Sequence, residues 1–74
     1  MVTVRDLFGA LDPTTHITIA RERPEGLYPV IAGPNRYPLT ELPVWAYRQH
    51  ACDIVRKVKT LPIDGEPTTV IIIL

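Results

Sequence analysis

Hydrophobic side chains near the start of the chain recur at the spacing of one helical face. Between residues 4 and 11 they occupy positions i, i+3, i+4 and i+7, which predicts a short amphipathic helix. Thr3 precedes this stripe and Asp6 follows three residues later, which is the arrangement of a capping box. The Asp-Pro pair at 12–13 ends the helix, because proline lacks an amide hydrogen and disfavours helical geometry at the residue before it.

The next segments alternate apolar and polar residues, as half-buried strands do. Residues 14–21 are rich in β-branched side chains and place two isoleucines on one face. A turn at 22–26, with proline followed by glycine, would connect this strand to a second one over 27–32. Pro29 lies inside that second strand and cannot donate to a ladder, so we expect the strand at a sheet edge or at a bulge.

A proline-rich stretch precedes a second predicted helix. Thr40 is a suitable N-cap, and a short helix is expected over 41–49, with Pro43 tolerated in its first turn. Trp45 falls on the apolar side of this helix, so we expect it in the core, with contact to a partner as the alternative.

The stretch after this helix has two interpretations. Its apolar spacing matches a continuation of the helix to residue 60, whereas residues 53–60 are also β-branched enough for a strand. We prefer the strand, because the Asp-Gly pair at 64–65 is a strong turn signal and would pair it with the final segment, 68–74. That final segment ends in an apolar run without alternation, which is typical of a strand covered on both faces or paired on both sides.

The predicted order of elements is helix, strand, strand, short helix, strand, strand. It indicates a single α+β domain over residues 1–74, built as two layers. We expect an antiparallel sheet of three to four strands packed on the N-terminal helix, with a second short helix beside it. A chain of this length must spend nearly every apolar segment on one core.

Composition excludes several classes of protein. Eight basic and eight acidic side chains give a net charge of zero, which argues against the cationic field of most nucleic-acid binders and equally against an acidic DNA mimic. The single Cys52 permits no internal disulfide and suits a reducing compartment, so a cytoplasmic location is expected. The longest apolar run, 70–74, is far shorter than the about 20 residues of a membrane span, and the start lacks the pattern of a signal peptide.

Residues with catalytic or metal-binding chemistry form no recognisable motif. The only candidate nucleophile is Cys52, with His50 or His16 as its base, and we expect a buried, inert thiol beside a surface histidine. The two histidines and one thiol lack the paired spacing of a zinc site, and the four glycines are isolated from one another. We therefore predict no catalytic residue, no metal and no cofactor.

Arginines interleaved with aromatic residues flank the predicted first hairpin. Such residues can bind phosphates and stack on bases, although two glutamates, at 22 and 25, offset their charge. The candidate nucleic-acid-binding residues are Arg21, Arg23, Tyr28 and Arg36.

The segment 37–48 is dense in tyrosine, tryptophan and arginine, which dominate the energetic centres of protein interfaces. Exposed anchors are expected at Tyr47 and Arg48 in particular. The candidate partner-binding residues are Tyr37, Trp45, Tyr47 and Arg48.

The last segment also offers a route to self-association. If residues 70–74 lie at a sheet edge instead of its interior, their unpaired backbone would join a second copy in a continuous sheet. A second copy of this chain, in a homodimer, is therefore the other predicted partner.

Several segments together resemble a group of small proteins. They are VRDL at 4–7, LD at 11–12, THITI at 15–19, VRKV at 55–58 and VIII at 70–73, and the pattern is similar to small, mostly uncharacterised proteins of phages and prophages of Gram-positive bacteria. The resemblance implies a cytoplasmic accessory protein of a mobile element, some of which inhibit host defence nucleases. It carries over no catalytic or binding residue.

Together these observations predict a non-enzymatic protein-interaction module, in the form of a phage-encoded accessory protein or an inhibitor of a host-defence protein. The alternative is a weak nucleic-acid or nucleotide-binding protein that uses the arginine and tyrosine residues around the first hairpin. The sequence identifies neither the partner nor the source organism.

Overall fold

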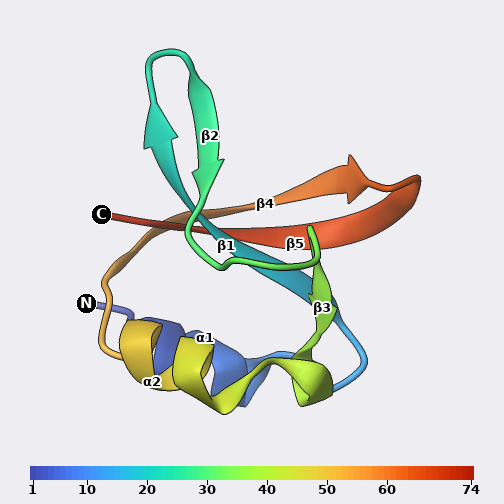
Figure 1. The fold of residues 1–74 in the computed structure, drawn as a ribbon. Helices are drawn as coiled ribbons and strands as arrows, with labels where there is room; N and C mark the ends of the chain where they lie inside the picture. The colour runs from blue at the N-terminus through green and yellow to red at the C-terminus, as the bar shows by residue number, and fades with distance from the viewer.

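The computed structural model describes residues 1–74, and both of its helices lie on the same side of a curled mixed sheet (Figure 1). The elements in chain order are α1 (Val4–Ala10), β1 (His16–Arg23), β2 (Gly26–Pro29), β3 (Tyr37–Pro38), a 3-10 turn (Leu39–Glu41), α2 (Val44–His50), β4 (Val55–Ile63) and β5 (Glu66–Ile73). The strand order is β2-β1-β5-β4, and β3 adds to the start of β1. No helix is long and apolar enough to cross a membrane.

The predicted capping box at the start of α1 is confirmed. The Thr3 amide donates to Asp6 Oδ2 at 3.0 Å, and the Asp6 amide donates to Thr3 Oγ1 at 3.3 Å. The first two helical amides donate to the carbonyls of Asp53 and Ala51, each at 3.0 Å. These bonds satisfy amides that a helix start leaves without internal partners, and they join α1 to the segment after α2.

The second short helix is present but begins later than expected. Thr40 is not its N-cap, because Leu39–Glu41 form a separate 3-10 turn. Leu42 is extended, with φ −62° and ψ 127°, and α2 starts at Val44 directly after Pro43. The cause is Pro43, which disfavours helical geometry at the residue before it.

The strand interpretation of residues 53–60 is confirmed, since β4 spans Val55–Ile63 and pairs antiparallel with β5. The expected Asp-Gly turn joins them, with φ of 53° at Asp64 and 79° at Gly65, as a two-residue hairpin turn requires. β2 is shorter than predicted and ends at Pro29, which lies opposite Ala20. The Val30 amide still donates to the Ile19 carbonyl at 3.0 Å, so the missing amide hydrogen of Pro29 costs no bond to β1.

The expectation of a wholly antiparallel sheet of three to four strands is wrong. The sheet has five strands, β1 and β5 are parallel, and the two-residue β3 was not anticipated. Strands β1 and β5 are the most buried strands of the sheet, and side-by-side pairing at its centre shields both from water. The chain that connects them passes through α2 and β4, a crossover long enough for parallel pairing.

The sheet buries apolar side chains on both of its faces. On the helix-covered face the buried set is Val4, Ile17, Ile19, Ile31, Ala46, Ile71 and Ile73. On the opposite, helix-free face the buried set is Ala20, Val70 and Ile72, flanked by Leu27, Leu61 and Ile63. A central strand that is buried on both faces explains why the last segment carries no polar alternation.

Ile71 and Val58 offer a matched test of this packing, because they are cross-strand partners on the helix-covered face. Ile71 is fully buried whereas Val58 is 44% exposed. Ile71→Val should lower the free energy of unfolding by about 1 kcal/mol through the lost methylene and the void left behind. Val58→Thr, which keeps the β-branch, should change it by less than about 0.5 kcal/mol in urea denaturation. Equal losses in the two variants would contradict the placement of the core.

Candidate functional site

Helix α2 buries one face and presents apolar side chains on another. Ala46 and His50, four residues apart, are buried against the rest of the fold, whereas Val44 and Trp45 are 64% and 50% exposed. The expectation that Trp45 belongs to the core is therefore wrong. The helix approaches the core through the small side chain of Ala46, which leaves the bulky indole on a different face. Arg48 is exposed next to both residues, at the spacing of helix-surface neighbours.

An apolar groove of about 290 Å³ lies alongside this exposed face. Its lining residues are Phe8, Leu39, Leu42, Val44 and Tyr47. The rings of Phe8 and Tyr47 stack with centroids 5.7 Å apart and planes inclined by 25°, which fixes one wall of the groove between α1 and α2. We call the groove together with Trp45 and Arg48 the α2 surface.

Sequence reasoning identified three residues of the α2 surface and missed the rest. It selected Tyr47, Trp45 and Arg48, which the structure places on one helix. It missed Phe8, because that residue comes from a distant helix and reads as core. It also missed Val44, the apolar first residue of α2, because the buried face of this helix is set by Ala46 and His50.

Tyr37, the fourth predicted contact residue, has internal partners. It is half-buried in β3 and packs against the main core. Its hydroxyl donates to the Ala32 carbonyl at 3.2 Å. A Cβ added to Gly33 would lie only 2.7 Å from the Tyr37 hydroxyl oxygen. Gly33 also has φ of +109°, which favours glycine. Tyr37 thus closes the loop before β3, and its role in partner binding stays a prediction.

The predicted nucleic-acid patch is only partly assembled. Arg21 and Tyr28 are cross-strand neighbours of β1 and β2, and Arg23 lies two residues further along β1. Arg36 comes instead from the loop before β3. Two of these side chains already bond within the chain: the Arg21 guanidinium donates to the main-chain carbonyl of Leu74 at 3.2 Å, and the Tyr28 hydroxyl to a glutamate at 3.2 Å.

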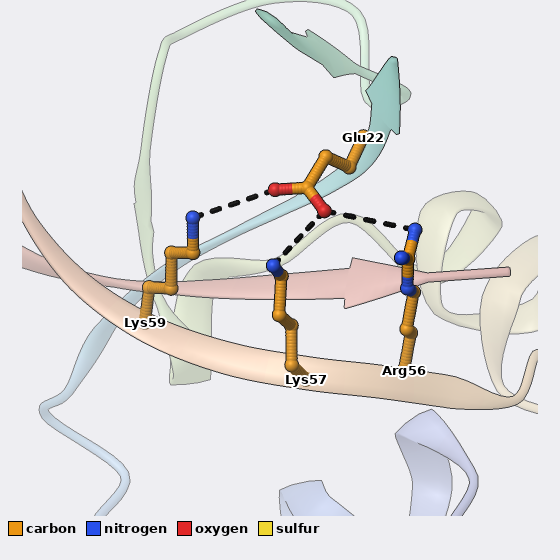
Figure 2. A network of polar contacts seen from close by, with 4 residues as sticks. All are labelled: Glu22, Arg56, Lys57 and Lys59. Atoms are coloured by element: carbon orange, nitrogen blue, oxygen red, sulfur yellow. Dashed lines mark hydrogen bonds and ion pairs between the residues drawn. The ribbon is translucent and has the colours of Figure 1, made fainter. Parts of the chain in front are cut away.

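A charged network that the sequence did not predict spans the helix-free face (Figure 2). Glu22 of β1 reaches across β5 to three cations of β4, which we call the β4 cationic row. Its carboxylate oxygens lie 2.9 Å from Lys57 Nζ, 3.4 Å from Lys59 Nζ and 3.6 Å from Arg56 Nη1. In the sequence, the run RKVK at 56–59 places Lys57 and Lys59 on one face of a strand. Only the strand order of the folded sheet brings the Glu22 carboxylate to these cations.

The pKa of Glu22 is lowered from its ordinary value. The hydrogen bond from Lys57 is the largest cause, and Lys59 adds to it, while partial removal from water acts in the opposite direction. The network also covers apolar structure, because Ile72 lies between Ala20 and Lys57 in the strand register and is fully buried. Lysine stems commonly cover apolar surface in this way while their charged ends stay in water.

The expected burial of Cys52 and His50 is reversed. Cys52 is exposed, whereas His50 is only 4% exposed and its Nδ1 lies 2.8 Å from Asp53 Oδ2. The Nε2 atom of His50 is buried without a hydrogen-bond partner. The reversal follows from Ala51, which is buried next to the end of α2 and directs the following cysteine outward. No three His, Cys, Asp or Glu side chains form a cluster that could hold a metal ion.

Glu22→Gln should remove a pH-dependent part of the stability. Because folding lowers the pKa of Glu22 from an unfolded value near 4.5, its charged form stabilises the folded state above that pH. This contribution falls as the pH drops through the lowered folded pKa. The wild type should therefore exceed Glu22→Gln in unfolding free energy at neutral pH, and the difference should vanish in strong acid. A pH-independent difference in urea denaturation would contradict the network.

Comparison with known proteins gives no relative: no family model, no curated protein and no solved structure matches this chain. The resemblance to phage and prophage proteins therefore stays a prediction.

Proposed function

We propose that this chain is a non-enzymatic protein-interaction module and that a protein partner docks on the α2 surface. The observation that carries the proposal is a half-exposed tryptophan beside a groove lined only by apolar and aromatic side chains. An exposed tryptophan beside a contiguous apolar groove, with a cation at its rim, is a composition typical of protein-interaction sites. Tryptophan and arginine are also the residues enriched in the energetic centres of interfaces.

The groove and the Trp45 indole would contact different parts of the partner. The groove, about 290 Å³ in volume, is open to an apolar anchor side chain from the partner. Trp45 can then pack over that anchor. Burying about 100 Å² of indole surface is worth about 2.5 kcal/mol at 25 cal/mol per Å². Arg48, at the rim, would select among partners by charge more than add affinity.

A randomised peptide library displayed against the immobilised protein tests this proposal. Selected peptides should carry apolar anchors and should bind the wild type in solution. Trp45→Ala should weaken their binding by about 2 kcal/mol, or about thirtyfold in Kd, whereas Gln49→Ala, on the exposed part of the same helix, should leave it unchanged. Trp45 is the only tryptophan, so a blue shift of its fluorescence should accompany binding.

Other outcomes would count against the α2 surface. Peptides that bind Trp45→Ala as tightly as the wild type would place docking elsewhere. A single-stranded oligonucleotide that binds in a salt-dependent way, and more weakly to Arg21→Gln, would favour the nucleic-acid alternative. Circular dichroism of each variant checks that the fold is retained.

A further inference from the structure

The outer edge of β4 is the longest strand edge that the fold leaves unpaired. β4 is the last strand in the order β2-β1-β5-β4 and spans Val55–Ile63. The opposite edge is the four-residue β2, which ends in Pro29. An unpaired edge presents N–H and C=O groups to any extended chain that can align with it. The β4 edge is therefore the better template for an added strand.

The chain itself already pairs with the beginning of this edge. The amide of Val55 donates to the carbonyl of Val2 at 2.9 Å, and Thr3 forms an isolated antiparallel bridge with Ile54. Beyond Val55, β4 has β5 as its only strand partner. The part of β4 from residue 56 to residue 61 is thus a free edge that starts where the intramolecular pairing stops.

Proline and the turn indicate which backbone groups of the free edge point outward. The two-residue turn closes on Ile63 and its partner in β5, and alternate residues of an antiparallel ladder bond to the neighbouring strand. Counting back from Ile63 places the amides and carbonyls of Val58 and Thr60 on the outer side. Pro62 belongs to the same outward set, where its missing N–H costs no bond to β5.

The charges beside the free edge select the kind of strand that can add to it. The β4 cationic row supplies three positive charges, and Glu22 is the only carboxylate that contacts them. The cationic side chains remain accessible, with Arg56 54% exposed and each lysine 41% exposed. A second copy paired edge to edge would bring two cationic rows together, which is repulsive. A strand that carries carboxylates would complete the charge balance.

We propose that the free edge of β4 binds an extended acidic peptide segment, which joins the sheet as a further strand and sets its carboxylates against the β4 cationic row. Backbone bonds to Val58 and Thr60 supply affinity, and the cations supply the preference for acidic sequences. Glu22 competes with the peptide for the same cations. This surface is separate from the α2 surface, so the proposal does not depend on the function proposed above.

A fluorescein-labelled peptide of alternating glutamate and threonine is the probe, with binding followed by fluorescence anisotropy. Two control peptides share its length: one carries lysine in place of glutamate, and one has alternate backbone amides methylated so that it cannot pair as a strand. The acidic peptide should bind at least about tenfold more tightly than either control, and its affinity should fall as salt rises. The amides of Val58 and Thr60 should gain protection from hydrogen exchange.

Variants that remove single charges distinguish binding at the β4 edge from non-specific electrostatic attraction of the acidic peptide to the protein. Glu22→Gln should strengthen binding of the acidic peptide about threefold, because it frees the cations from their internal carboxylate. Lys59→Gln should weaken binding about threefold. Arg5→Gln, which removes an exposed cation from α1, should leave it unchanged. Thermal unfolding of each variant confirms that the folded state is populated.

Four results would overturn the proposal. The first is equal affinity of the methylated and unmethylated acidic peptides, and the second is a Glu22→Gln variant that binds no more tightly than the wild type. The third is a single-stranded oligonucleotide that binds more tightly than the acidic peptide. The last is a homodimer, detected by sedimentation, that protects the amides of Val58 and Thr60 and is not displaced by the peptide.

Discussion

The structure depends on the burial of β5 on both faces and along both edges. Its residues alternate between the two faces of the sheet: Ile71 and Ile73 join the core under the helices, and Val70 and Ile72 join the cluster on the helix-free face. A chain of 74 residues forms a single helical layer, which covers one face only (Figure 1). The second face must be shielded by the sheet itself and by long side chains.

That requirement accounts for the charged network on the helix-free face. Glu22 and the β4 cationic row meet above β5 (Figure 2), and the lysine stems lie beside the buried Ile72. Exposed ion pairs of this kind contribute little stability individually. Their larger effect is on organisation, because they fix long side chains over apolar surface and leave the outer edge of β4 beside an excess of positive charge.

The α2 surface has a similar cause on the helical side, where few side chains are available to cover the apolar residues. The helix contacts the core through Ala46 and His50, which are enough to anchor seven residues but leave the largest side chain of the helix outside. Phe8 and Tyr47 stack to bridge α1 and α2 without filling the space beside them. The exposed apolar groove on the helical layer and the free strand edge of the sheet thus follow from how few residues are available to cover them.

Local chemistry made several features readable from the sequence. The Thr3–Asp6 capping box and the Asp64–Gly65 turn follow from contacts within a few residues, and both are confirmed. The strand after Asp53, which the local pattern leaves open between helix and strand, was preferred because of that turn, and it is confirmed as well. The unbroken apolar run favours the interior of the sheet for β5, and β5 does lie between β1 and β4. The alternative edge position of residues 70–74, on which the predicted self-association depended, is wrong.

The tertiary structure alone decided the strand order, the parallel pairing of β1 with β5 and the partners of each surface residue. The sequence marks Trp45 as apolar and Glu22 as acidic, but the face that α2 turns to the core and the strand that lies across from Glu22 are set by packing between distant segments. The pattern of apolar and polar residues along the chain indicates which side chains are buried. Which residues they contact depends on how helices and strands from distant parts of the sequence pack together.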